Sequence, residues 1–580
     1  MTLNPSTACA QQIVTSLVAA GVRYIVLAPG SRSAPLAYAL AAADEAGWCQ
    51  VHVSVDERSA AFIALGLARQ GPAAVVTTSG TAVANLHPAV LEAGHGHLPL
   101  VLVTADRPHQ LRGVGANQTT DQVKIFGSTM RQAWEIPAGP EAASMAGQIV
   151  HRAVIAATGR RSRYPGPVHL NVGFADPLTP DELWQPGPPP HPGAPAAGAR
   201  PAPPTELQRG PATVVVAGDG AALPGPAGDA IRERVQQWGW PVLAEPSSGL
   251  RGSNWAVPAG HVLVRNPRLA ENIERVVVLG RPTLQRSIAG LLARTDIPVL
   301  VVSQWADWTD VAGTAAQIYD DVTVPGEPTP SEQQWWHRWQ RAARAAQQVL
   351  AAPADPSAPT DPSTPADHST PAEPNEADRL TGPAVARELL SAPGEVMLGS
   401  SMAARHADLA GPVGAELAAV VHANRGLAGI DGTIATATGL ALRGSPVRVL
   451  IGDLTFQHDA TSLIRGTLEE EVDLQVVVLD DRGGSIFAML EHGQEKYRGV
   501  FDRFFRTPQS LDMAAMARAA GAQYQQVRTV GELRAQLAQP VRGRSVVRIE
   551  LADDGGASRL AAQVTSAVES VLAQELQHGG

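Results

Sequence analysis

Two aspartates stand at the ends of two predicted strands in the last third of the chain. Asp453 follows the largely apolar run 447–451, and Asp481 follows the run 476–479. Both runs are short, continuous and rich in Val, as buried parallel strands are. The segment 460–468 between them has helical character, which predicts a strand–helix–strand unit. Because the carboxyl ends of parallel strands meet at one edge of a sheet, the two carboxylates should face one crevice, where they would suit Mg²⁺.

Each aspartate alone has a simpler interpretation, because Asp is a preferred residue at a helix N-terminus, where it caps free N–H groups. The two together favour a site for a metal ion and a diphosphate group instead, since both are accompanied by glycine. Gly452 precedes Asp453, and Gly483 and Gly484 follow closely after Asp481.

A third acid, Glu57, follows the predicted strand 51–55 and precedes a predicted helix of small residues over 59–70. Asp56 and Arg58 flank it. A Glu in the first turn of a helix is usually a favourable charge near the helix N-terminus and nothing more. Position alone therefore leaves the role of Glu57 open.

Four arginines stand at predicted turns: Arg32, Arg107, Arg405 and Arg425. A single arginine in such a place is most often an ion-pair partner on the surface. The planar guanidinium group nevertheless binds a carboxylate through two parallel hydrogen bonds, which the Lys ammonium cannot do. The set is therefore suited to substrates that carry carboxylates.

The elements that must position these side chains alternate between strand and helix along the chain. Two segments interrupt the alternation, one of Pro, Gly and Ala and one of Pro, Ser, Thr, Ala and Asp. Neither can bury apolar surface, so both are predicted to be linkers or disordered loops. Repeated strand–turn–helix order predicts an α/β protein of three doubly wound parallel-sheet domains. The predicted bounds are 1–184 for the first domain, 185–210 for a linker, 211–350 for the central domain, 351–378 for a second linker and 379–580 for the last domain.

Thirteen buried strands are predicted within these domains. They are 24–27, 51–55, 74–78, 100–104, 213–217, 241–244, 275–279, 298–302, 396–398, 419–422, 447–451, 474–479 and 545–549. A helical tail is predicted over 558–577. Trp335, Trp336 and Trp339 stand on a predicted helix at a spacing that indicates packing rather than a ligand site. The sequence Gly218-Asp219-Gly220 lacks the third glycine of a dinucleotide fingerprint.

The composition excludes several classes of protein. The 580 residues carry a net charge of −10 without any basic run, so no nucleic-acid-binding surface is expected. Only two cysteines are present, Cys9 and Cys49, which excludes a disulfide scaffold and indicates a reducing compartment. The N-terminus does not resemble a signal peptide, and no apolar run is long enough to cross a bilayer. We therefore expect a soluble, cytoplasmic protein without a membrane span.

The two aspartates and their glycines resemble the diphosphate-binding motif of the thiamine-diphosphate enzymes. In this chain Gly452 and Asp453 open the motif, and Asp481 stands 28 positions after Asp453. The family pattern has Gly where this chain has Leu454, and Asn where it has Asp481. Since Asp and Asn both offer an oxygen ligand, the second departure bears on the choice of metal.

The first third resembles the pyrimidine-binding domain of the same family, through Glu57 and the run 77–86. The resemblance implies that Glu57 hydrogen-bonds N1′ of the cofactor's aminopyrimidine and so promotes deprotonation of the reactive carbon. This role needs a buried carboxyl with a raised pKa, which an apolar subunit interface would provide. The resemblance implies that thiamine diphosphate is bound by Glu57, Gly80, Ile430, Gly452, Asp453, Asp481 and Gly483. Asp453, Asp481 and the main-chain carbonyl of Gly483 would hold Mg²⁺ or Mn²⁺.

Further motifs are similar to one branch of this family, the menaquinone-pathway enzymes that use the dicarboxylates 2-oxoglutarate and isochorismate. These motifs are 28–33, 106–108, 115–122, 399–405, 424–432 and 483–487. The implied substrate-binding residues are Ser31, Arg32, Arg107, Asn117, Gln118, Ser401, Arg405, Arg425, Ile486, Phe487 and Leu490. Ser401 and Arg405 would contact isochorismate. Arg281 or Arg286 of the central domain is a further candidate.

The reaction implied by this branch is the decarboxylation of 2-oxoglutarate and the 1,4-addition of the resulting succinyl carbanion to isochorismate. The cofactor would lie between the first domain of one subunit and the third domain of another, so a homodimer or homotetramer is expected. Two other interpretations stay open. One is another carboligase or decarboxylase of the family, such as a relative of acetolactate synthase, which in some members needs a flavin; the arginines and Asn117-Gln118 argue against it. The other is a sensor without catalysis, against which the joint presence of Glu57, Asp453 and Asp481 argues.

Overall fold

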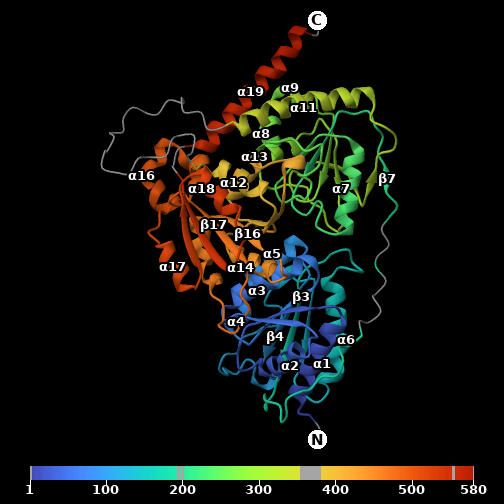
Figure 1. Cartoon of the computed structure of the whole chain (residues 1–580). Coiled ribbons are helices and arrows are strands. Elements are labelled where there is room, and N and C mark those ends of the chain that lie inside the picture. The colour runs from blue at the N-terminus through green and yellow to red at the C-terminus, as the bar shows by residue number, and fades with distance from the viewer. Residues whose placement is uncertain (1–2, 192–197, 199–201, 353–379, 552–554, 579–580) are drawn as a thin grey trace, which may run out of the picture.

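The computed structural model describes residues 3–191, 198, 202–352, 380–551 and 555–578. Within them, three larger parallel sheets follow one another along the chain, and helices cover both faces of each (Figure 1). The N-terminal sheet lies at the bottom of the view, the central sheet at the upper right and the C-terminal sheet at the upper left. The predicted fold class, α/β with three doubly wound parallel sheets, is confirmed.

The first sheet has the strand order β2-β1-β3-β4-β6-β5. Its strands are β1 (Tyr24–Leu27), β2 (Gln50–Val53), β3 (Ala73–Thr77), β4 (Leu100–Asp106), β5 (Gln132–Ile136) and β6 (Val168–Gly173). One face packs on α1 (Pro5–Ala19), α2 (Ala34–Glu45) and α6 (Ala142–Ala157), and the other packs on α3 (Glu57–Leu67), α4 (Thr81–Asn85) and α5 (His87–Gly96). The strands between these two helix layers are buried on both faces, as the continuous apolar runs predicted.

The central sheet has the order β12-β11-β10-β8-β9. Its strands are β8 (Thr213–Ala217), β9 (Val242–Ala244), β10 (Arg275–Leu279), β11 (Val299–Val302) and β12 (Ala315–Tyr319). One face packs on α7 (Pro226–Trp238), and the other on α8 (Gly260–Leu263), α9 (Pro267–Ala270), α10 (Arg286–Leu292), α11 (Pro330–Ala351) and the C-terminal α19 (Gly556–His578). Trp335 and Trp339 are buried in this core, and Trp336 packs edge-on against Trp255. The prediction that these tryptophans pack is confirmed.

The third sheet has the order β15-β14-β16-β17-β19-β18. Its strands are β14 (Gly394–Leu398), β15 (Ala419–Ala423), β16 (Val447–Gly452), β17 (Leu474–Asp480), β18 (Gln523–Val527) and β19 (Arg544–Glu550). One face packs on α12 (Gly382–Ser391), α13 (Met402–Ala410) and α18 (Val530–Leu537), and the other on α14 (Thr433–Ala441), α15 (Asp453–Asp459) and α17 (Met513–Ala519). The short α16 (Arg498–Phe501) lies in the segment between β17 and α17.

The structure corrects the predicted helix between Asp453 and Asp481. The helix predicted over 460–468 begins earlier, as α15 directly at Asp453, and passes into a 3₁₀ turn that ends at Leu463. Two physical causes fit this shift. An acid in the first turn is favoured by the helix dipole, and Gly466 disfavours helix in the segment that follows.

Three strands of the first and third sheets were not predicted. β5 and β18 are polar edge strands with mostly exposed side chains, so they lack the apolar run on which the predictions rested. β6 is buried but carries His169 and Asn171. Their buried hydrogen bonds could not be foreseen from local sequence.

The two predicted linkers differ in how far the structure describes them. Part of the linker 185–210 is strand, because β7 (Thr205–Glu206) pairs in parallel with β13 (Val322–Thr323). In the second linker, residues 353–378 lie outside the described residues. Among the helices of the described residues, none is both long and apolar enough to cross a membrane. Cys9 and Cys49 are buried free thiols.

Candidate active site

Ligands of doubly wound proteins bind where the order of the strands reverses. In the first sheet this point lies between β1 and β3, and in the third sheet between β14 and β16. The turns after β1 and β3 carry Arg32 and Gly80, and the turns after β14 and β16 carry Ser401 and Asp453. The topology therefore places predicted site residues at both switch points.

The turns after β1 and β3 pack directly on each other. A Cβ on Gly30 would lie 2.3 Å from the Cβ of Thr78, so a residue other than glycine would push the turns apart. Gly80 has a φ of 84° and begins α4. Its N–H group donates to the side-chain oxygen of the buried Gln122 over 3.0 Å. The positive φ is costly for a residue with a Cβ, which explains the glycine at this position.

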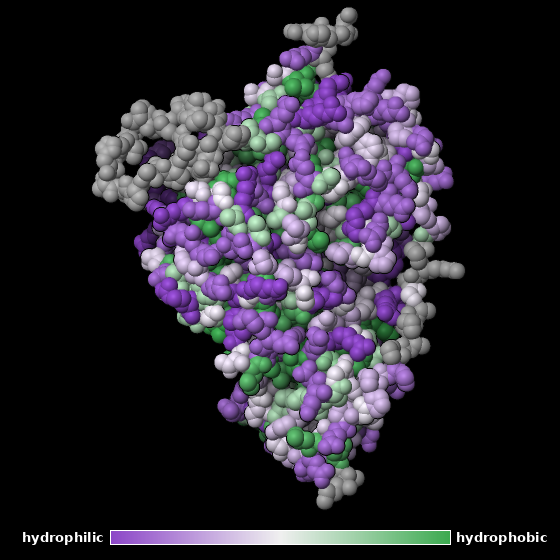
Figure 2. Space-filling model, viewed as in Figure 1, coloured by the Kyte–Doolittle hydropathy of each residue, from purple (hydrophilic) through white to green (hydrophobic). Residues whose placement is uncertain are grey.

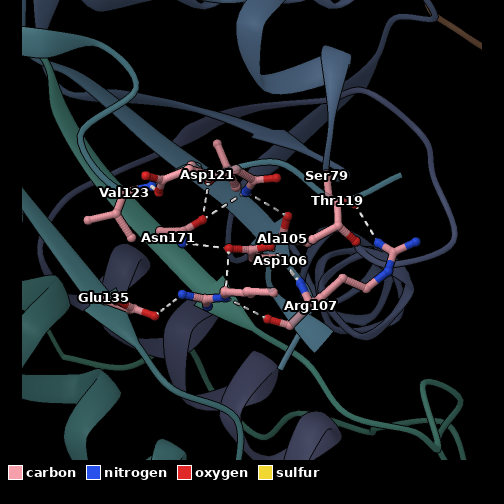
Figure 3. A network of polar contacts seen from close by, with 12 residues as sticks. Ser79, Ala105, Asp106, Arg107, Thr119, Asp121, Val123, Glu135 and Asn171 are labelled. Carbon is pink, nitrogen blue, oxygen red and sulfur yellow. Dashed lines mark hydrogen bonds and ion pairs between the residues drawn. The ribbon is translucent and has the colours of Figure 1, made fainter. Parts of the chain in front are cut away.

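Arg107 lies at the right of the network of polar contacts in this half of the site, next to Asp106 (Figure 3). Its side chain is buried, and Nη1 donates to Ser79 Oγ over 2.6 Å. Gln118 closes the same group, since its Nε2 donates to the Ser79 carbonyl and its own carbonyl accepts from Ser79 Oγ, both over 3.0 Å. Burial and the neighbouring charge of Arg32 both lower the pKa of Arg107. Two guanidinium groups held this close form a natural site for an anion.

Arg32 is the second member of this pair. Its Nη1 donates to the Phe174 carbonyl over 3.0 Å and lies 3.7 Å from the Asp176 carboxylate. Its Nε is buried and has no hydrogen-bond partner in the described part of the chain. Ser31, which precedes Arg32 in the sequence, is exposed. Asn117, which precedes Gln118, is exposed as well. This half of the site is open to solvent in a single chain.

A buried network that the sequence analysis missed holds Arg107 in place (Figure 3). The fully buried Asp106 accepts from the Arg107 N–H at 2.7 Å and from Asn171 Nδ2 at 2.9 Å, and it lies 3.2 Å from Arg112 Nε. Gln122 donates from Nε2 to Asn171 Oδ1 over 2.8 Å. Asp106 and Gln122 stand inside motifs that the sequence revealed, so the signal was there. Asn171 lies on the unpredicted strand β6.

Glu57 is the first residue of α3, and its neighbour Asp56 caps that helix by accepting the N–H of Arg58 over 2.9 Å. The Glu57 carboxylate accepts from Asn85 Nδ2 over 3.3 Å. The side chain is only half-buried, and Val55 close by is 83% exposed. The buried carboxyl expected from the resemblance is therefore not formed by one chain alone.

Asp453 and Asp481 are close enough for the charge of Asp481 to act on Asp453. Asp453 is 7% exposed, and its Oδ1 accepts the N–H of Leu454 over 2.8 Å. Burial and then the negative charge of Asp481 raise the pKa of Asp453 to about 7, against a backbone hydrogen bond from Gly483. Asp481 also accepts the hydroxyl of Ser485. Two crowded carboxylates are destabilised by each other's charge, so this donor set fits a hard divalent cation.

Gly483 borders the two carboxylates and has a φ of 125°. A Cβ there would lie 2.2 Å from the Arg506 carbonyl oxygen. The close approach and the backbone conformation both require glycine. The next residue, Gly484, donates its N–H to the same carbonyl over 2.7 Å, which fixes the turn after β17.

Arg405 and Arg425 form a second arginine pair, where the C-terminal domain meets the central domain. Arg405 Nη1 donates to the Ser401 carbonyl over 3.1 Å, and Nη2 donates to the Leu284 carbonyl over 3.4 Å. Arg425 is buried, and its Nη2 donates to Thr283 Oγ1 over 3.1 Å. Burial and then the charge of Arg425 lower the pKa of Arg405. Thr283 and Leu284 are contacts that no sequence motif indicated.

Unsatisfied groups and backbone strain surround this second pair. In the described residues, Arg425 Nε and Ser400 Oγ are buried without a hydrogen-bond partner. Buried polar atoms are nearly always paired, so these two point toward a ligand. Ser401 has a φ of 71°, a conformation that costs a residue with a side chain ~1–3 kcal/mol and that clusters at functional sites.

The predicted apolar residues lie on either side of these groups. Ile486, Phe487 and Leu490 are half-buried in the segment after β17, where the Phe487 ring lies 5.9 Å from that of Phe505. Ile430, predicted to contact the cofactor, is exposed in the loop before α14. These side chains form an apolar border that is incomplete in the single chain.

Within one chain, the start of α3 contacts the C-terminal end of α15. Next to Glu57, Arg58 Nη1 lies 3.2 Å from His458 Nδ1, and its Nη2 lies 3.3 Å from Asp459 Oδ1. Asp459 ends α15, whereas Asp453 begins it, and a helix of seven residues is about 10 Å long. The start of α3 therefore lies beside the C-terminal end of α15, about 10 Å along that helix from Asp453.

The two candidate arginines of the central domain, Arg281 and Arg286, contact the domains on either side. Arg281 donates to the His95 carbonyl of the N-terminal domain and, over 2.7 Å, to the Gly426 carbonyl of the C-terminal domain. Arg286 forms an exposed 2.8 Å ion pair with Glu491, and its charge is among those that lower the pKa of Arg405. Arg286 thus faces the second arginine pair, whereas Arg281 holds the domains together.

A cavity of about 910 Å³ lies between the N-terminal and central domains, and Thr283, the hydrogen-bond partner of Arg425, is among its lining residues. Its lining includes His97, Arg131, Trp305 and Asp307. Among the described residues that line the cavity, Arg281 is the one that the sequence analysis named as a site candidate. Arg107, Arg425 and Asp453 are themselves buried, whereas Ser31, Asn117 and Ile430 are exposed.

Comparison with known proteins assigns the two terminal thirds to one family. The family described as "Thiamine pyrophosphate enzyme, N-terminal TPP binding domain" matches residues 7–125, and "Thiamine pyrophosphate enzyme, C-terminal TPP binding domain" matches residues 410–551. Among solved structures, benzoylformate decarboxylase from Polynucleobacter necessarius superposes with a TM-score of 0.62 over 94% of this chain and 99% of that chain. At 17% identity this likeness shows the fold.

The fold and the two matched domains define a thiamine-diphosphate enzyme. Relatives named 2-succinyl-5-enolpyruvyl-6-hydroxy-3-cyclohexene-1-carboxylate synthase include the protein of Kineococcus radiotolerans, 45% identical over 98% of this chain and 100% of its own length. The protein of Nocardioides sp. is 43% identical over 93% of this chain and 94% of its own length. This chain belongs to that synthase family, whose members are thiamine-diphosphate-dependent transferases of menaquinone biosynthesis.

Proposed function

We propose that this chain releases carbon dioxide from 2-oxoglutarate and adds the remaining four-carbon unit to isochorismate. One observation carries the assignment of substrates: two pairs of adjacent arginines, Arg32 with Arg107 and Arg405 with Arg425. In each pair, burial and the neighbouring charge lower the pKa of one guanidinium group. Like charges are held together at such a cost where an anion relieves it, and each pair suits one dicarboxylate.

Glu57 is the catalytic acid of the proposal, and Gly80 and Ile430 border the cofactor. Bound thiamine diphosphate supplies the nucleophilic carbon and the electron sink for decarboxylation and carbon–carbon bond formation. Glu57 holds a proton at its carboxyl oxygen and shares it with the pyrimidine ring. Asn85 orients that carboxylate through its hydrogen bond. Once a neighbouring subunit covers the exposed Val55, the carboxyl is shielded from water.

Asp453, Asp481 and the carbonyl of Gly483 would hold Mg²⁺ or Mn²⁺, with Gly452 leaving room for the diphosphate group. The fit is supported by the raised pKa of Asp453, which a cation beside the two carboxylates would reverse. The described residues contain no cluster of three or more His, Cys, Asp or Glu side chains suited to a metal. Main-chain and diphosphate oxygens would complete the shell, as is usual for Mg²⁺.

The remaining polar and apolar residues bind the substrates in this proposal. Ser401 and Arg405 contact isochorismate, and Arg425 lies beside them. Ile486, Phe487 and Leu490 form the apolar wall that excludes water. On the other half-site, Ser31, Asn117 and Gln118 accompany Arg32 and Arg107. These contacts orient the two carbon atoms that must meet, which is where most of the protein's contribution to such a reaction lies.

The active enzyme is a homodimer or a dimer of dimers, in which the N-terminal domain of one subunit covers the C-terminal domain of another. The half-sites within one chain lie apart, and apolar side chains are exposed near each of them: Val53, Val55, Leu427, Ile430 and Ile464. Figure 2 shows green apolar patches on the visible face of the lower, N-terminal part of the molecule. A chain with net charge −10 and two buried free cysteines fits a reducing cytoplasm without nucleic acid as a partner.

The direct test uses the purified chain with thiamine diphosphate and Mg²⁺. With 2-oxoglutarate labelled in the carboxyl next to the ketone, we expect at most one labelled carbon dioxide per site until isochorismate is added, and many turnovers afterwards. Mass spectrometry of the product should show the four-carbon unit joined to isochorismate. Turnover of pyruvate in place of 2-oxoglutarate, or release that ignores isochorismate, would contradict the proposal.

A further inference from the structure

The loop that carries Arg425 is the place where all three domains meet. It covers 423–427, directly after β15, and its residues are buried except for Leu427. The N-terminal domain reaches it through Glu92 of α5 and Arg69, and the central domain reaches it through Arg281. The backbone of the loop, rather than its side chains, receives most of these contacts.

Glu92 makes the most specific of these contacts. Its side chain is 5% exposed, and its two carboxylate oxygens accept the consecutive N–H groups of Gly426 over 2.6 Å and Leu427 over 2.8 Å. Two successive N–H groups that point to one place form a concave binding site, and here the carboxyl group of a side chain from another domain occupies it. Burial raises the pKa of Glu92, and the two N–H groups and the charge of Arg69 oppose that shift. A Cβ on Gly426 would lie 2.8 Å from Glu92 Oε2. The glycine and the acid therefore fit each other.

The loop is fixed on the other side of Arg425 as well. Arg69 Nη2 donates to the Ala423 carbonyl over 2.8 Å and to Asn424 Oδ1 over 2.9 Å. Arg281 Nη2 donates to the Gly426 carbonyl over 2.7 Å. The backbone is thus held immediately before and immediately after Arg425.

Arg425 itself has few contacts that could place it. In the described residues its Nη2 has one hydrogen bond, to Thr283, and its buried Nε has none. The position of its guanidinium group is therefore set largely by the backbone on either side. A displacement of about 1 Å at a substrate-orienting group is enough to reduce turnover on the order of a hundredfold.

We propose that Glu92 is a positioning residue that fixes Arg425 for its substrate through the N–H groups of Gly426 and Leu427. The inference rests on the proposed function in one respect, the assignment of Arg425 to substrate binding. Glu92 touches neither the predicted cofactor residues nor the other arginines. Its effect must therefore appear in the kinetics of the substrate that Arg425 binds.

The test compares Glu92→Gln, Arg425→Ala and the double variant as holoenzymes. The change to Gln replaces one of the two acceptor oxygens with an NH2 donor, so one N–H of the loop loses its acceptor. We expect Glu92→Gln to raise KM on the order of tenfold for the same substrate that Arg425→Ala affects, and to leave the KM of the other substrate unchanged. In the Arg425→Ala background the further change to Gln should have little effect, because the residue through which Glu92 acts is gone.

Arg443→Ala is the matched control. Arg443 also joins the C-terminal and N-terminal domains, through the Leu67 carbonyl, but it lies beyond the far end of α14. The Arg443→Ala variant should have a lower unfolding temperature than the wild type, and its KM values for both substrates should be unchanged. Should Glu92→Gln not fold, Glu92→Asp keeps the charge and should show the same pattern with a smaller change.

Two results would overturn the proposal. One is a Glu92→Gln enzyme that folds and keeps the KM values of the wild type. The other is an effect of equal size with and without Arg425, which would show that Glu92 acts on the whole domain contact. Failure of the wild-type enzyme to use 2-oxoglutarate and isochorismate would instead count against the proposed function.

Discussion

Single residues of the candidate site are held where their charges are unfavourable without a ligand. Asp453 is crowded by Asp481, and each arginine pair brings two positive groups together in partly buried surroundings. A stable fold accepts such an arrangement where bound partners of opposite charge compensate for it. The site residues are therefore the ones whose substitution should change ligand binding more than folding.

We expect Glu57→Gln to abolish turnover while thiamine diphosphate still binds. The amide keeps the shape of the side chain and its contact with Asn85, but it cannot share a proton with the pyrimidine nitrogen. The loss should be on the order of a hundredfold or more, as for other removed acid–base groups. Steady-state rates and a cofactor titration check the two halves of this expectation. A variant with near-normal turnover would remove Glu57 from its assigned role.

Asp453→Ala should lose the part of the cofactor affinity that depends on Mg²⁺, by a factor of about 10 to 100 or more. The carboxylate is proposed to connect the protein to the diphosphate group through the metal. Quenching of tryptophan fluorescence during cofactor titration, with and without Mg²⁺, measures the effect. Asp453→Asn keeps one oxygen ligand, so its cofactor affinity should lie between those of the wild type and Asp453→Ala. An unchanged dissociation constant in Asp453→Ala would speak against the metal site.

The strands that carry these residues could be predicted where they are buried along their whole length. Strands such as β16 and β17 are apolar runs buried on both faces, and the turns after them could be located from that pattern. The polar edge strands β5 and β18 could not, because their side chains are mostly exposed. Contacts made across domains were also hidden. Neither the pairing of Arg425 with Thr283 nor that of Glu92 with the loop leaves a trace in local sequence.

On α13, Arg405 stands one turn after Ser401, so both can face one ligand. Arg405→Ala should raise KM for isochorismate about 10- to 100-fold, since a charge-assisted contact to a carboxylate contributes about 1.5–3 kcal/mol. Release of the first carbon dioxide from 2-oxoglutarate should persist. Arg542→Ala is the matched control, because its exposed 3.2 Å ion pair with Asp473 contributes little. If the variant stops releasing carbon dioxide but binds isochorismate normally, Arg405 serves 2-oxoglutarate instead.

Glu245, which follows β9, should make stability fall with rising pH. It is buried, it accepts the N–H of Leu284 over 2.7 Å, and burial raises its pKa from 4.5 to about 8. Between these two values the folded protein keeps the proton and the unfolded chain releases it. The free energy of unfolding therefore decreases as pH rises, by about 1.4 kcal/mol per pH unit from this group.

Glu245→Gln removes that titration and keeps an acceptor for Leu284. Its unfolding midpoint in urea should depend less on pH than that of the wild type between about pH 5 and about pH 8, and the variant should be the more stable of the two at the upper end. Parallel curves for the two proteins would show that the carboxyl titrates normally.

At the scale of the whole molecule, the proposal places each cofactor between two subunits. Glu57 and the first arginine pair lie on the N-terminal domain, and the aspartates and the second pair lie on the C-terminal domain. α15 separates Glu57 from Asp453 in the same chain. In the proposal, a second copy covers the exposed apolar residues near both halves and completes each site.

Mixing two inactive variants tests this arrangement most directly. Glu57→Gln and Asp453→Ala subunits are combined under conditions that allow subunit exchange, and turnover of 2-oxoglutarate with isochorismate is measured. If each site takes Glu57 from one subunit and Asp453 from the other, every mixed dimer contains one intact site. An equal mixture should then recover about a quarter of the wild-type activity. If each site were formed within one chain, every site would carry a substitution, and the mixture would stay as inactive as its components.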